Sequence, residues 1–280
     1  MSKQENKIEN PLGTQPIGQL LKKFAVPSII AMLVSALYNI VDQFFIGNSV
    51  GELGNAATNI AFPLTTSCIA IALLFGIGGA SAFNLSMGRG ETEDAVHYMG
   101  NAAVAMFGCG FFLFLICQFF LTPMVYFFGA PENIAGYAKT YIRITSIGFP
   151  FLILSSGGGH LIRADGSPKV TMMCNLVGAI INTILDAIFV FGFGMGMAGA
   201  ALATIIGQFV SGGMAIRYLS HCKSVTLQKR HLKIQKKYLS RIISLGGAPC
   251  SNQLAMMVVQ IAMNNILRHY GAQSNYGSEI

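Results

Sequence analysis

The chain has 280 residues, of which 53% are hydrophobic and only 10% are charged. Soluble domains carry about 25% charged residues, so these few charges exclude an ordinary water-soluble surface and indicate a membrane protein. The net charge of +7 does not indicate nucleic-acid binding, because the basic residues lie in short connectors without the interleaved aromatic side chains of a nucleic-acid-binding face.

Seven long apolar segments follow a polar start. A helix that crosses the hydrocarbon core of a bilayer needs about 20 mostly apolar residues. By this criterion the predicted spans are, in chain order, Phe24–Gly47, Asn59–Leu85, Met99–Phe128, Tyr137–Leu161, Val170–Phe193, Met197–Leu219 and Ile242–Leu267. Most connectors between them are short and rich in turn-forming residues. The sequence therefore predicts an all-α membrane protein, a polytopic bundle of about seven transmembrane helices.

A longer basic segment after the sixth span divides the chain. We expect a cytoplasmic N-terminal segment at residues 1–23, a six-helix N-terminal lobe at 24–219, a basic cytoplasmic linker at 220–241, and the first helix of a truncated second lobe at 242–280. The seventh span also repeats a feature of the first, since Pro249 precedes Asn264 by the same interval that separates Pro27 from Asp42. A repeat that begins after six spans is typical of transporters built from two homologous halves.

The distribution of lysine and arginine predicts the orientation, because these residues are enriched on the cytoplasmic side. With the N-terminus inside, all of the 18 Lys and Arg residues except Lys139, Arg143 and Arg268 lie in cytoplasmic segments. We therefore expect a multi-pass protein of the plasma (inner) membrane, in contact with the lipid bilayer, with a cytoplasmic N-terminus.

Two aspartates, Asp42 and Asp186, stand inside predicted spans, where a charged side chain costs about 2.5–3.5 kcal/mol on insertion scales. At 1.5 Å rise per residue they lie roughly 27 and 24 Å beyond the cytoplasmic ends of their helices, so we expect them to share one level of the bilayer. Each belongs to a polar stripe with helical spacing, and such stripes face protein or a water-filled cavity. These stripes and the sixth span supply the candidate cavity-lining residues Ser35, Tyr38, Asn175 and Gln208.

A carboxylate pair in such a cavity can bind a proton, or a sodium ion shared with amide and hydroxyl oxygens. The candidate sodium ligands are Asp42, Asn182, Asp186 and Thr204. No cofactor is expected other than the coupling ion. Neutralising the carboxylates changes the charge within the cavity, and this change can bias an alternating-access equilibrium. Pro27 removes one backbone hydrogen bond and gives the first span a natural bending point.

Four stretches of the sequence resemble the multidrug and toxic compound extrusion (MATE) transporters, in particular the prokaryotic branch that includes the DNA-damage-inducible type. They are FAVPSIIAMLVSALYNIVDQFFIGNSVG, LIRADGSPKVTMM, NTILDAIFVFGFGMGMAGAALAT and ISLGGAPCSNQL, and together they cover essentially the whole chain. The resemblance implies two six-helix lobes that face each other across a central cleft. It also implies antiport, in which small amphipathic or cationic compounds leave as protons or sodium ions move in.

The resemblance further implies roles for particular residues. The positions that match the family's cation-coupling residues are Asp42, Asn182, Asp186 and Thr204, with the backbone carbonyl of Ala200. Pro27 matches the proline implicated in bending the first helix. The sequence departs from the family where Ala187 replaces a usual proline. It also has five helices fewer than the family's twelve, so we expect a missing C-terminal lobe in the full-length protein.

Other classes of protein remain as alternatives. A lipid-linked oligosaccharide flippase of the same superfamily would have a cleft rich in arginine or lysine, and the spans hold almost none. A seven-helix receptor would have its N-terminus outside. An enzyme is not expected, because no nucleophile–base pair, metal-binding motif or phosphate loop appears. The sequence leaves open which small molecule is exported and whether protons or sodium ions drive export.

Overall fold

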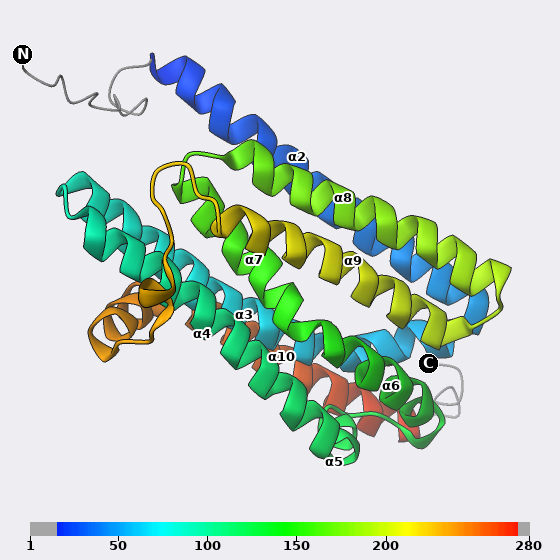
Figure 1. Ribbon diagram of the computed structural model, residues 1–280. Helices are drawn as coiled ribbons and strands as arrows, with labels where there is room; N and C mark the ends of the chain where they lie inside the picture. The colour runs from blue at the N-terminus through cyan, green and yellow to red at the C-terminus, as the bar shows by residue number, and fades with distance from the viewer. Residues whose placement is uncertain (1–15, 274–280) are drawn as a thin grey trace, which may run out of the picture.

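The computed structural model describes residues 16–273, and Figure 1 shows their arrangement. The elements are α2 (Ile17–Val50), α3 (Glu52–Gly88), α4 (Thr92–Phe119), α5 (Leu121–Phe127), α6 (Glu132–Thr145), η1 (Ser146–Gly148), α7 (Phe149–Ala164), α8 (Pro168–Asp186), η2 (Ala187–Gly192), α9 (Gly196–Leu219), η3 (Lys229–Leu232) and α10 (Lys236–Gln273). Every element in this part of the chain is helical, and the predicted all-α membrane fold is confirmed. Parts of the two terminal segments predicted from sequence, residues 1–15 and 274–280, lie outside the described residues.

Six helices in the described part are long and apolar enough to cross a membrane: α2, α3, α4, α8 with η2, α9 and α10. The fourth predicted span, Tyr137–Leu161, differs from the prediction of a single helix, because it is divided into α6, η1 and α7. Pro150 stands in the first turn of α7 and has no N–H to continue the α-helical ladder from the preceding turn. A 3-10 turn, Ser146–Gly148, therefore joins the two helices.

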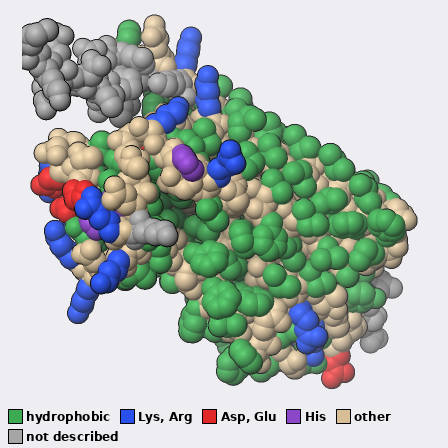
Figure 2. Space-filling view, viewed as in Figure 1, with side chains coloured by type: hydrophobic (Ala, Val, Ile, Leu, Met, Phe, Trp, Pro, Cys, Tyr) green, Lys and Arg blue, Asp and Glu red, His purple; other side chains and the backbone are tan. Residues whose placement is uncertain are grey.

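The outer surface of the bundle is apolar. Phe119, Ile40 and Phe112 are exposed by 79%, 66% and 64%, more than a water-soluble helix tolerates in such numbers. Figure 2 shows hydrophobic side chains over most of the visible face, while lysine and arginine gather mainly near the end where α2 begins. This distribution is that of a bundle surrounded by lipid, with polar ends.

Two groups of helices form the bundle. Helices α2, α8 and α9 lie together, α3 packs against α4 and α10, and α7 contacts both groups (Figure 1). Small residues bring backbones close together where helices cross: a Cβ atom on Gly76 of α3 would lie 2.6 Å from the carbonyl oxygen of Gly157 in α7. Glycine at such crossings is characteristic of membrane helices, which pack through van der Waals contact.

The linker between α9 and α10 is attached to α4 by a buried asparagine. Asn101 is 0% exposed. Its amide nitrogen donates to the carbonyl oxygens of His231 and Lys233, both at 3.4 Å, and its amide oxygen accepts from the N–H of Gln235 at 2.8 Å. One side chain thus satisfies three backbone groups of the linker.

We expect Asn101→Leu to lower the free energy of unfolding by about 1–3 kcal/mol, because the part-buried N–H of Gln235 would lose its acceptor. Thermal unfolding in detergent and the rate of trypsin cleavage in the linker measure the effect. Asn48→Leu, at an exposed position of α2, is the matched control and should change neither quantity. Equal stability of the two variants would show that Asn101 does not hold the linker in place.

Candidate functional site

The two membrane aspartates are both inside the bundle. Asp42 of α2 is 6% exposed and Asp186, the last residue of α8, is 0% exposed. Helix α2 packs against α8, and the two carboxyl groups are near enough to interact electrostatically. Neither side chain faces the exposed apolar surface. The aspartates therefore share one buried region between α2 and α8.

This region contains acceptor atoms without partners. The Oδ1 atoms of Asp42 and Asp186 are both buried, and neither has a hydrogen-bond partner among the described residues. Buried polar atoms in proteins are nearly always paired, so an unpaired carboxylate oxygen indicates a place for a proton or a cation. The hydroxyl groups of Tyr38 and Tyr141 lie within electrostatic range of both aspartates and line the same region.

An asparagine connects α8 to α9 beside this pair. With its amide nitrogen directed at Asp186, Asn182 donates to Oδ2 at 3.1 Å, and its amide oxygen then accepts from the backbone N–H of Thr204 at 3.1 Å. The opposite amide orientation would turn the oxygen toward acceptors only and the nitrogen toward donors only. Close packing makes this contact possible, since a Cβ atom on Gly207 would lie 2.9 Å from the carbonyl oxygen of Gly178.

The other residues predicted from sequence to belong to the site differ in how deeply the structure buries them. Ala200 is 0% exposed and lies one helical turn before the threonine of this group. Pro27 is buried within α2. Gln208 directs a buried, unpaired Oε1 atom toward η1. Asn175 is half-buried, whereas Ser35 is exposed on α2.

The backbone changes its helical form directly after Asp186. Residues Ala187–Gly192 form a π-helix, in which the N–H of Phe193 donates to the carbonyl oxygen of Ile188 at 2.9 Å. Short π-helical segments occur frequently at functional sites. The first residue of this segment is Ala187, at the position where MATE transporters usually have proline.

Tyr141 is a residue of this region that sequence reasoning did not identify. It lies on α6, and its hydroxyl is beside the side chain of Thr204. The sequence feature that could have indicated it is its four-residue spacing from Thr145, which places both side chains on one face of the helix. Hydropathy predicts one uniform apolar helix over the fourth span and so does not single out Tyr141.

A second cluster of ionisable side chains lies at the linker end of α4. Glu93, His97 and His231 offer ligand atoms that all lie within 4.8 Å of one another. However, Nδ1 of His231 accepts a hydrogen bond from the N–H of Gln228 at 3.0 Å, whereas a metal-bound imidazole normally donates from its second nitrogen. Nε2 of His231 therefore carries its proton toward Oε1 of Glu93, 3.2 Å away, where Arg230 also lies at 3.3 Å. This arrangement fastens the linker and does not favour a metal ion.

The fold and the site together define a class: a polytopic helical membrane protein with a carboxylate pair buried between its helices. The model of the MatE family matches residues 27–188, which is more than half of the chain. The chain belongs to the MatE family, and the resemblance to MATE transporters seen in the sequence is confirmed.

Similar proteins extend beyond this chain. Multidrug export protein MepA of Staphylococcus saprophyticus subsp. saprophyticus is 27% identical over 260 residues, which cover 91% of this chain and 57% of the relative. MepA of Staphylococcus aureus (strain NCTC 8325 / PS 47) is 25% identical over 265 residues, which cover 94% and 59%. The chain thus spans less than two thirds of the length of these relatives.

Solved structures show the same fold. The structure of the MATE multidrug transporter DinF-BH has a TM-score of 0.87 and 31% sequence identity, over 95% of this chain and 60% of that one. A MOP superfamily transporter from Pyrococcus furiosus Vc1 has a TM-score of 0.80 at 23% identity, over 88% of this chain and 55% of that one, and this likeness concerns the fold alone.

Proposed function

We propose that the full-length protein is a secondary antiporter that exports small amphipathic or cationic compounds as protons or sodium ions move into the cell. The observation that carries this proposal is the buried pair of Asp42 and Asp186. Neither aspartate forms an ion pair with a lysine or arginine within residues 16–273. Two neighbouring carboxylates without a basic partner need a proton or a metal cation for neutralisation.

The neighbouring oxygens suit such a cation. The unpaired Oδ1 atoms of Asp42 and Asp186 are acceptors of the kind that hard cations such as sodium prefer, and the hydroxyl of Thr204 lies 3.5 Å from the amide of Asn182. Asn182 itself presents its amide nitrogen to Asp186 and so supplies a hydrogen bond there. A captured cation removes the repulsion between Asp42 and Asp186 and so favours a conformation in which α2 and α8 are close. Release of the cation favours separation, which is the conformational difference that alternating access requires. Membrane potential adds about 2.3 kcal/mol per charge for every 100 mV.

The relatives support the choice of substrate class. MepA proteins carry the description of multidrug export proteins, and DinF-BH is described as a multidrug transporter. The proposal includes a single N-terminal lobe at residues 24–219, a linker at 220–241, and a second lobe that continues from 242 and completes the cleft. It also places the N-terminus and the linker on the cytoplasmic side of the plasma membrane, in agreement with the basic residues at that end of the bundle.

Transport by the full-length protein in liposomes tests the proposal. Movement of a fluorescent organic cation should follow an imposed proton or sodium gradient of opposite direction and should stop when an ionophore dissipates that gradient. Transport of the cation at the same rate without either gradient would contradict antiport. Movement of a lipid-linked oligosaccharide, with no movement of the organic cation, would favour the flippase of the same superfamily instead.

A topology experiment gives a further prediction. A reporter fused after residue 280 should lie outside the cell, because the six long helices and the divided fourth span of α6 and α7 make seven membrane crossings from a cytoplasmic N-terminus. The matched fusion within the linker, after residue 227, should lie in the cytoplasm. The reverse pattern would support the orientation of a seven-helix receptor.

A further inference from the structure

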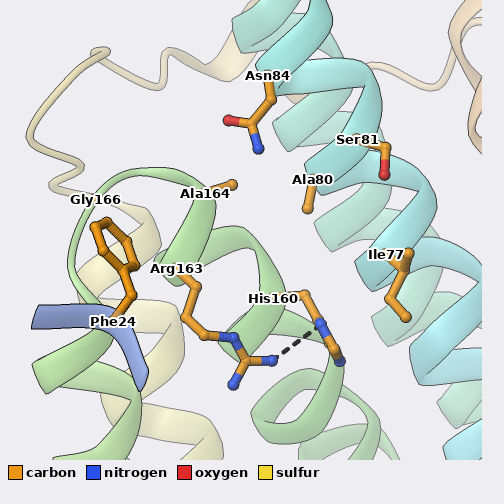
Figure 3. A pocket seen from close by; sticks show the side chains of 9 residues that line it. All are labelled: Phe24, Ile77, Ala80, Ser81, Asn84, His160, Arg163, Ala164 and Gly166. Carbon is orange, nitrogen blue, oxygen red and sulfur yellow. Dashed lines mark hydrogen bonds between the residues drawn. The ribbon is translucent and has the colours of Figure 1, made fainter. Parts of the chain in front are cut away.

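A pocket of about 330 Å³ opens between α2, α3 and α7. Phe24, Asn84, His160 and Arg163 are among the residues that line it, and Figure 3 shows them around one open space. It lies at the end of the bundle that carries the linker, because Asp165 at the end of α7 accepts hydrogen bonds from linker N–H groups. It is distant from the aspartate pair: Asp42 follows Phe24 by about 27 Å along α2.

The arginine of this pocket has an unusual partner. Arg163 is half-buried, and within the described part of the chain it forms no ion pair with a carboxylate. Its Nη2 atom lies 2.9 Å from Nδ1 of His160, as the dashed line in Figure 3 marks. Arginine can only donate hydrogen bonds, so Nδ1 of His160 is the acceptor and the ring carries its proton on Nε2. The histidine is therefore neutral and leaves the arginine charge uncompensated.

The remaining polar groups of the pocket include further donors. Asn84 is exposed on α3 and directs its amide toward the space between α3 and α7 (Figure 3). Ser81 adds a hydroxyl on the same helix. The acidic residue nearest in sequence, Asp165, is occupied by the Tyr218 hydroxyl at 2.7 Å and by the two backbone donors of the linker. No carboxylate lines the pocket among the described residues.

A half-buried guanidinium with neutral donors around it matches the chemistry of a phosphate group, which arginine binds through two parallel hydrogen bonds. The pocket also has an apolar wall, formed by Phe24, Ile77 and Ala80, next to the lipid-facing surface of α2. We propose that this pocket binds a phosphate group, either as free phosphate or as the headgroup of an anionic phospholipid. This is a binding site separate from the one proposed for transport.

Binding to purified, delipidated full-length protein tests the proposal. The probes are inorganic phosphate, phosphatidylglycerol and diacylglycerol, which lacks the phosphate, and the readouts are the thermal unfolding midpoint and the bound mass in native mass spectrometry. We expect phosphatidylglycerol to bind and diacylglycerol not to bind. Stabilisation by inorganic phosphate as well would identify the phosphate as sufficient, whereas its failure would show that the acyl chains are also needed.

Two variants locate the binding. Arg163→Gln should weaken binding of phosphatidylglycerol by about tenfold or more, since a charge-assisted hydrogen bond is lost. Asn84→Asp, at an exposed position of α3, should weaken it similarly by placing a negative charge in the pocket. Lys169→Gln removes an exposed positive charge near the same end and is the matched control, with binding unchanged. Absence of binding to the wild type, or equal binding by wild type, Arg163→Gln and Asn84→Asp, would overturn the proposal.

Discussion

Asp42→Asn in the full-length protein should abolish cation-coupled export while membrane insertion stays intact. Asparagine preserves the size of the side chain but cannot gain or lose a charge, so capture of a cation would no longer change the interaction of Asp42 with Asp186. The measurement is efflux of a fluorescent organic cation from cells, together with the amount of protein in the membrane fraction. We expect efflux to fall to the level of cells that lack the transporter, with the amount of protein unchanged.

Glu52→Gln is the matched control for this experiment. Glu52 is an exposed carboxylate in the first turn of α3, and its neutralisation should leave efflux at the wild-type level. Because the two aspartates are proposed to act as a unit, Asp186→Asn should show the same loss as Asp42→Asn, and the double variant should be no worse. Wild-type efflux by Asp42→Asn would refute the coupling role.

Gly246→Leu should cause a large loss of stability by forcing α10 away from α3. A Cβ atom at Gly246 would collide with the carbonyl group of Leu74 in α3, and one at Gly78 of α3 would collide with that of Ile242 in α10. Two backbones in direct contact cannot admit a side chain unless the helices move apart. Overpacking of this kind costs about 1–3 kcal/mol, and more where the backbone cannot shift. Thermal unfolding in detergent measures the loss.

The neighbouring glycine gives a matched control. A Cβ atom at Gly247 would meet nothing within 4 Å, so Gly247→Leu should preserve or slightly raise the unfolding midpoint. Both substitutions replace glycine by a good helix former, so their difference isolates the collision with α3. A similar midpoint for the two variants would show that α10 does not depend on this crossing.

The membrane helices could be predicted from sequence because hydropathy over about 20 residues reflects a single physical requirement, burial in hydrocarbon. The helical rise predicts that Asp42 and Asp186 share one level of the bilayer, and the structure buries both side chains between the helices. The break at Pro150 could not be predicted, since proline also occurs inside intact membrane helices, as Pro27 and Pro63 do in this chain.

The contacts that hold the site and the linker depend on tertiary structure. Asn101 stands within an apolar stretch of the sequence. Nothing in that stretch predicts that its side chain binds a linker more than 130 positions away. Tyr141 was likewise one of several aromatic residues in the fourth span. The pairing of Asn182 with the backbone of Thr204 required the approach of α8 and α9 at two glycines, which spacing within one helix does not reveal.

The number of cations bound by each molecule of the purified full-length protein tests the central proposal most directly. Bound protons are measured as protons released into solution, and bound sodium is measured as radioactive sodium retained by the protein. A shared site predicts one cation per protein, displaced by an organic cation and lost on substitution of Asp42 or of Asp186. Independent binding at the two aspartates, or unchanged binding after Asp42→Asn, would contradict it.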